Sequence, residues 1–90
     1  MTTVDFLKLN IFAKKSIDFL FSHANCSLDD FIISGNSDKF EQALKRSFYA
    51  CFVPSIYRLS IEYLDNSVNV IVYNASSNLR IFSFRYAFDA

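Results

Sequence analysis

The sequence predicts an α+β fold in which three N-terminal helices pack on one face of a three-stranded antiparallel β-meander. The spacing of apolar residues is about 3.6 before Pro54 and 2 after it, and these are the periods of a helix and of a strand. Hydrophobic residues make up 52% of the 90 residues and aromatic residues 18%, a composition typical of a folded core and not of disorder. No linker, repeat or low-complexity run divides the chain, so we expect a single domain over residues 1–90.

Residues 4–22 are predicted to form the first helix, because apolar side chains recur there at helical spacing. The broader apolar face consists of Phe6, Leu9, Ala13, Ile17 and Leu20. A second, narrower stripe consists of Val4, Leu7 and Ile11. One face is expected to pack on the domain, whereas the other either packs as well or remains free.

Two further helices are predicted before Pro54. Ser27 precedes two acidic residues with the spacing of a helix cap, and Gly35 lies where a left-handed C-terminal cap belongs, so residues 28–34 read as a short helix. Asn36 or Ser37 is expected to cap a third helix over residues 38–52, which Pro54 ends. The apolar face of that helix is Phe40, Ala43, Leu44, Ser47, Phe48 and Cys51.

Three strands are predicted at residues 56–64, 68–74 and 79–88. The clusters between them are rich in Asp, Asn and Ser, and Asn tolerates the positive φ of tight turns. Such short connections make the sheet an antiparallel meander. The first turn is expected to set Tyr63 opposite Val68.

The register of the last strand decides which side chains face the helices. Aromatic residues occupy every second position from Phe82 to Phe88, so they share one face of the strand. Pairing Val72 with Ile81 would turn them outward, whereas pairing Val72 with Phe82 turns them inward. We favour the inward register, because each Phe contributes about 1.5–3 kcal/mol when fully covered. In either register, the sheet face away from the helices is expected to be more apolar than a solvated face.

The charge balance and the cysteine content bear on the binding partners and the cellular location that are expected. Nine basic and nine acidic side chains give a formal net charge of zero, so no long-range field attracts nucleic acid or an anionic membrane. A signal peptide has a basic region followed by an apolar run, and the N-terminus shows no such pattern, so no signal peptide is expected. No membrane span is expected either. Cys26 and Cys51 are expected to be core thiols and not a disulfide, in a protein of the cytoplasm.

No catalytic or metal-binding constellation stands out. His23, Cys26 and Cys51 could ligate zinc with Asp29 or Asp30, but structural zinc sites usually show two paired couples of ligands and here Cys51 is isolated. A Cys–His pair has no acid nearby to orient the imidazole. We therefore expect no metal, no cofactor and no enzymatic activity.

The function predicted is stoichiometric protein binding, as an inhibitor, an immunity factor or an accessory protein. Small size and the absence of catalytic residues suggest, by analogy alone, a viral, phage or mobile-element protein. The partner is a larger target or a second copy in a homodimer, because exposed aromatic patches and edge strands favour association. The residues expected to make the contact, together with the edge backbone of residues 79–88, are Ile71, Tyr73, Ile81, Phe82, Phe84 and Arg85.

The alternative function is DNA binding, because the order of elements matches a winged helix-turn-helix. Residues 38–52 would be the recognition helix, and the turn at residues 65–67 would be the wing. Against this alternative, the chain is not basic, and acidic residues lie at the start of that helix and on the turn. The side chains that would face DNA are Lys39, Gln42, Lys45 and Arg46.

Overall fold

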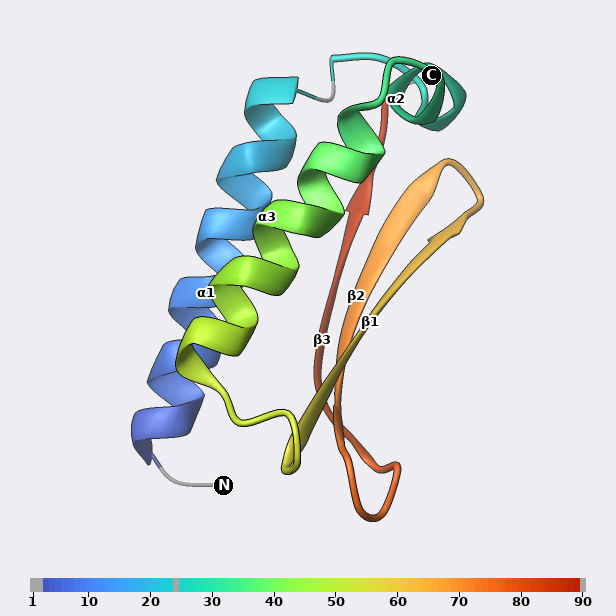
Figure 1. The fold of residues 1–90 in the computed structure, drawn as a ribbon. Coiled ribbons are helices and arrows are strands. Elements are labelled where there is room, and N and C mark those ends of the chain that lie inside the picture. The colour runs from blue at the N-terminus through green and yellow to red at the C-terminus, as the bar shows by residue number, and fades with distance from the viewer. Residues whose placement is uncertain (1–2, 24, 90) are drawn as a thin grey trace.

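The computed structural model describes residues 3–23 and 25–89 of the chain. The helices α1 (Thr3–His23), α2 (Leu28–Ile33) and α3 (Asn36–Cys51) precede the strands β1 (Tyr57–Leu64), β2 (Ser67–Asn74) and β3 (Arg80–Ala87). The strands form one antiparallel sheet in the order β1-β2-β3. Figure 1 shows α1 and α3 side by side across one face of the sheet, with α2 at one end. The predicted α+β fold is confirmed.

The core fills the space between the two long helices and the inner face of the sheet. Aromatic rings dominate it, since Phe48 meets Phe12 edge-on at 5.4 Å between centroids and stacks on Phe52 at 4.8 Å. The large side chains that are fully buried are Leu9, Leu20, Phe31, Phe40, Phe48, Val68, Val70 and Val72. Such dense burial offsets the limited fraction of surface that a domain of this size can bury.

The helix α1 is rotated relative to the prediction. Leu9 and Leu20 face the core as expected, but Phe12 and Ser16 lie between them on the buried face, and Phe6 is half exposed. The rotation has a physical reason, because it places the Phe12 ring against both α3 and the sheet, where it also meets Phe84 at 6.5 Å. The predicted inward position of Phe6 is therefore wrong.

The helices α2 and α3 are joined by a tight turn at Gly35. The Ser27 hydroxyl caps α2 by accepting a hydrogen bond from the Asp30 backbone N–H at 3.3 Å, and Gly35 follows α2 with a φ of +84°. Both features were predicted. The predicted cap of α3 at Asn36 or Ser37 is wrong, because the helix already begins at Asn36 and no side chain caps it.

The register of the sheet resolves the ambiguity in the last strand. Tyr63 pairs with Val68 and Val72 pairs with Phe82, as predicted. A four-residue loop between Asn74 and Leu79, which without an irregularity would pair Val72 with Ile81, is also present, since the Asn74 N–H donates to the Leu79 carbonyl at 2.8 Å. A β-bulge reconciles the two: Tyr73 pairs with Arg80, so that Ile81 is the extra residue.

Two tyrosines of β1 bind carboxylates of the helices. The Tyr57 hydroxyl donates to Asp5 Oδ2 at 3.1 Å, and the Tyr63 hydroxyl donates to Glu41 Oε2 at 3.3 Å. Burial, followed by the charge of Glu41, raises the pKa of Tyr63 well above its usual range. Burial and the hydrogen bond to Asp5 also raise the pKa of Tyr57. These bonds connect both α1 and α3 to the edge strand β1.

Candidate protein-binding surface

The rear face of the sheet, away from the helices, is mainly polar. Alternation along the strands turns outward the side chains of Arg58, Ser60, Glu62, Asn69, Ser83 and Arg85. Ile71 lies at the centre of this face but is only 3% exposed, and its neighbours across the two strand pairs are Ser60 and Ser83. The expectation of an unusually apolar rear face is therefore wrong, because Ile71 is almost completely covered and the β-bulge brings Ile81 against the core.

The six residues predicted to bind a partner are divided between the two faces. Phe82 and Phe84 pack against the core, and the bulge brings Ile81 against the core as well. On the rear face, Tyr73 is half-buried beneath the Arg58 guanidinium, which lies 5.0 Å from the centre of its ring. Arg85 is exposed and donates from Nε to Ser67 Oγ at 2.9 Å. The predicted residues thus do not form one continuous apolar patch.

Exposed apolar side chains, including Ile33, Leu64 and Leu79, occur in several parts of the chain, and three others form a row on α1. Val4, Leu7 and Ile11 are 59%, 56% and 57% exposed, and their spacing of three and four residues places them on one line along the helix. We call these three residues the α1 stripe. It is the narrower of the two stripes predicted from the sequence, and the structure leaves it free of contact with the core. Aliphatic side chains on one line of a surface helix are typical of a contact with another chain.

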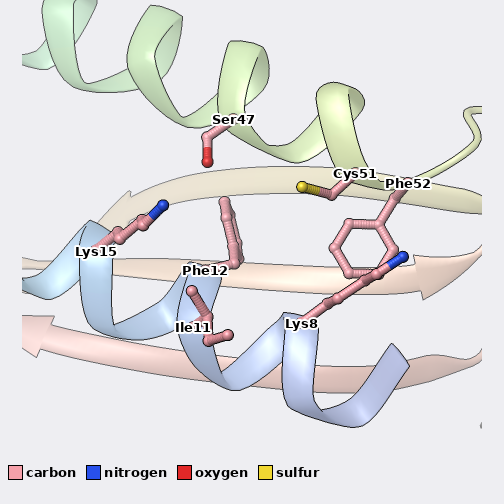
Figure 2. Close-up of a pocket in the computed structure, with 7 residues that line it drawn as sticks. All are labelled: Lys8, Ile11, Phe12, Lys15, Ser47, Cys51 and Phe52. Carbon is pink, nitrogen blue, oxygen red and sulfur yellow. The ribbon is translucent and has the colours of Figure 1, made fainter. Parts of the chain in front are cut away.

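A hollow of about 110 Å³ adjoins the α1 stripe, between α1 and α3 (Figure 2). The rings of Phe12 and Phe52 give it an apolar floor, and Ile11 belongs both to the hollow and to the stripe. In Figure 2 the side chains of Lys8 and Lys15 extend from α1 along this hollow. The hollow therefore combines apolar contact area with two cations.

A second hollow, of about 190 Å³, continues the first along the same two helices and shares Lys15 and Ser47 with it. We call the two together the α1/α3 groove. Its α3 side includes, beside Leu44 and Phe52, a row of small side chains at four-residue spacing, namely Ala43, Ser47 and Cys51. Small residues in a four-spaced row leave a trough between packed helices, which is why the groove stays open.

Cys51 lies at this groove and is exposed, so the prediction that it is a core thiol is wrong. It occupies the last turn of α3, where the helix borders the open hollow and not the sheet. Cys26 is partly buried, and both cysteines are free thiols. Within the described residues, no group of three His, Cys, Asp or Glu side chains could hold a metal ion. The His23 ring instead stacks on Phe19 at 4.2 Å between centroids.

The side chains considered for DNA binding all lie exposed on α3, namely Lys39, Gln42, Lys45 and Arg46. The turn proposed as a wing does not extend freely, however. Asn66 in that turn accepts a hydrogen bond from the Leu28 N–H and donates one to the Phe88 carbonyl. A wing must reach the DNA backbone, whereas this turn is held against α2 and the end of β3.

The two lysines of the groove, Lys8 and Lys15, were not singled out from the sequence as binding residues. The spacing of Val4, Leu7 and Ile11 was visible, but Lys8 and Lys15 read as ordinary solvated charges. A search for lysines seven residues apart beside an apolar stripe would have found them, since they recur on one side of the helix.

No protein-family model matches the chain, and no curated protein or solved structure matches it. Within the described residues, no helix is both long enough and apolar enough to cross a membrane.

Proposed function

We propose that this chain is a small, non-enzymatic protein-binding module that acts stoichiometrically, as an inhibitor, immunity factor or accessory protein. The observation that carries the proposal is the continuity of the α1 stripe with the α1/α3 groove through Ile11. The contact surface proposed from the structure thus differs from the rear sheet face expected from the sequence. The free thiols of Cys26 and Cys51 suit a protein of the reducing cytoplasm.

The free energy gained by covering the α1 stripe alone is too small for stable association, so the contact surface must be larger. Covering the exposed half of each of the three aliphatic side chains contributes about 1 kcal/mol apiece. Association costs about 4–15 kcal/mol in lost translational and rotational freedom, so about 3 kcal/mol from the stripe is not sufficient. The apolar floor of the groove must contribute as well, together with charged contacts around it.

The proposal can be tested by affinity capture from the native host, with the immobilised chain and matched variants. We expect Ile11→Asp to lose the specific partner, because it places a charge where the stripe meets the groove. Ile33→Asp is the control, since Ile33 is an even more exposed aliphatic residue on α2, away from the groove. Loss of the partner with both variants, or with neither, would contradict the assignment of this surface.

The rear sheet face and self-association are tested in the same experiment. Tyr73→Asp changes the one half-buried aromatic ring of the rear face and is expected to retain the partner. A homodimer through the sheet edges would instead appear in light scattering of the unmodified chain. If Ile11→Asp leaves such a dimer intact, the binding surface is on the sheet and not on the α1 stripe.

DNA binding remains the second candidate function, because the basic residues of α3 are accessible together. If it is correct, Lys45→Glu combined with Arg46→Glu abolishes a salt-dependent mobility shift that Ile11→Asp leaves intact. If the unmodified chain causes no shift at low salt, this candidate is excluded.

A further inference from the structure

We infer that the occupant of the α1 stripe and the adjoining groove is an acidic amphipathic helix, and this inference rests on the proposed function. Recognition of a helix by an apolar seam is one of the recurring modes of protein binding. Three features support it here: the spacing of the stripe, the positions of the two lysines and the absence of acid from the lining of the groove.

The α1 stripe has the spacing of a coiled-coil seam. Val4, Leu7 and Ile11 are separated by three and then four residues, which is the pattern by which one helix presents side chains to another. The three side chains span about 10.5 Å along α1, at 1.5 Å per residue. The next positions in the pattern are Lys14 and Asp18, so the apolar part of the seam ends at Ile11.

Lys8 and Lys15 give the seam its charge. They are seven residues apart, both are exposed, and both line the hollow beside Ile11 (Figure 2). In a coiled coil, such flanking positions select the partner through charge. A partner helix with two carboxylates seven residues apart would place both at the same spacing as the lysines.

Nothing acidic in the groove competes with such carboxylates. The α3 side of its lining contributes alanine, serine, cysteine, leucine and phenylalanine, and the α1 side contributes no Asp or Glu. The acidic residue nearest to Lys8 along α1 is Asp5, whose carboxylate accepts the Tyr57 hydroxyl at 3.1 Å. The cations are therefore the charges that a ligand in the groove meets.

The same charges disfavour a second copy as the occupant. In a symmetric dimer, the same surface of both copies forms the interface. Lys8, Lys14 and Lys15 of one copy would then approach those of the other, and like charges across an interface oppose association. An acidic helix meets the same apolar residues without this repulsion.

The test uses the full chain and two synthetic helical peptides that differ only in charge. Both carry leucines at coiled-coil spacing, and one has glutamates where the other has lysines, at flanking positions seven residues apart. Fluorescence anisotropy is expected to show that the glutamate peptide binds at least about tenfold more tightly than the lysine peptide. Equal binding of the two peptides, or no binding of the glutamate peptide, would overturn the inference.

Variants of the chain locate the contact. Lys8→Glu combined with Lys15→Glu is expected to reverse the preference between the two peptides. Lys39→Glu combined with Lys45→Glu changes the net charge equally on the exposed side of α3, and is expected to keep the preference for glutamate. Circular dichroism confirms that each variant is folded. If both double variants reduce binding equally, the attraction comes from net charge and the assigned site is wrong.

Other occupants give distinct results. A dimer in sedimentation equilibrium that Ile11→Asp abolishes would make the second copy the occupant. Flotation with anionic vesicles that Ile11→Asp abolishes, together with no peptide binding, would make a lipid surface the occupant. If a native partner depends on Ile11 but the glutamate peptide does not bind, the proposed function stands and the acidic helix is rejected. If neither partner nor peptide binds, both proposals fail.

Discussion

Asn66 Oδ1 accepts a hydrogen bond from the backbone N–H of Leu28 at 2.9 Å, across 38 positions of the chain. The same side chain donates from Nδ2 to the Phe88 carbonyl at 3.0 Å, and the Phe88 N–H returns a bond to the Asn66 carbonyl at 2.9 Å. One amide in the β1–β2 turn therefore holds the start of α2 and the end of β3 together. Its backbone φ of +55° is one that Asn tolerates better than most residues.

This junction predicts a graded loss of stability. Asn66→Ala removes both side-chain bonds and strains the backbone, so we expect the free energy of unfolding to fall by about 2–4 kcal/mol. Asn66→Asp keeps the acceptor and loses the donor, and is expected to cost about 1 kcal/mol. Urea denaturation measures both. Asn78→Ala is the control, because Asn78 has a φ of +58° without these bonds, and an equal loss there would contradict the role of the amide.

The exposure of the α1 stripe predicts a contrast between two neighbouring positions. Ile11→Gln is expected to change the free energy of unfolding by less than about 0.5 kcal/mol, because the side chain is largely exposed. Leu9→Gln buries an amide among apolar groups and is expected to cost about 3–5 kcal/mol. Thermal or urea denaturation compares them. A large loss for Ile11→Gln would mean that the stripe packs within the chain itself.

The raised pKa of Tyr63 predicts a loss of stability in alkali. Burial and Glu41 favour the neutral phenol in the folded state, so the folded pKa exceeds the unfolded value of about 10. The stabilisation is therefore complete below pH 10 and is lost as the pH rises above 10 toward the folded pKa. Urea midpoints measured between pH 8 and 11 test this expectation.

Two variants identify the groups responsible for the alkaline loss. Glu41→Gln removes the nearby charge and is expected to lower the pKa of Tyr63, as read from phenolate absorbance. Tyr63→Phe is expected to weaken the dependence of stability on pH above 10, although Tyr57 retains a smaller contribution because its pKa is also raised. An unchanged pH profile in Tyr63→Phe would assign the effect to another residue.

Substitution of Gly35 is expected to lower the free energy of unfolding only through backbone conformation. A Cβ at this position would meet no atom within 4 Å, so substitution causes no clash, but a φ of +84° is unfavourable for residues with a side chain. We expect Gly35→Ala to cost about 1 kcal/mol and Gly35→Asn less, because Asn tolerates left-handed backbone. Urea denaturation compares the two variants. Equal costs would indicate that something other than backbone conformation limits this turn.

The sequence by itself determined the order of the elements, their bounds to within two residues and the pairing of the strands. These features follow from local signals: apolar periodicity, the cap at Ser27, the glycine at 35, and Asn residues at turns with positive φ. The inward position of the Phe82 to Phe88 aromatic residues also followed, since it covers the larger apolar surface.

Only the tertiary structure decided which surface remains uncovered. The rotation of α1 that buries Phe12 depends on how its ring fits against Phe48 and Phe84, which lie far away in the sequence. The bulge at Ile81 likewise depends on tertiary contacts. The strands β2 and β3 must be joined by the four-residue loop and must also turn the aromatic residues of β3 toward the core. Such fits are set by contacts between distant residues, so an uncovered apolar row with lysines beside it appeared on α1, while the rear of the sheet is mainly polar.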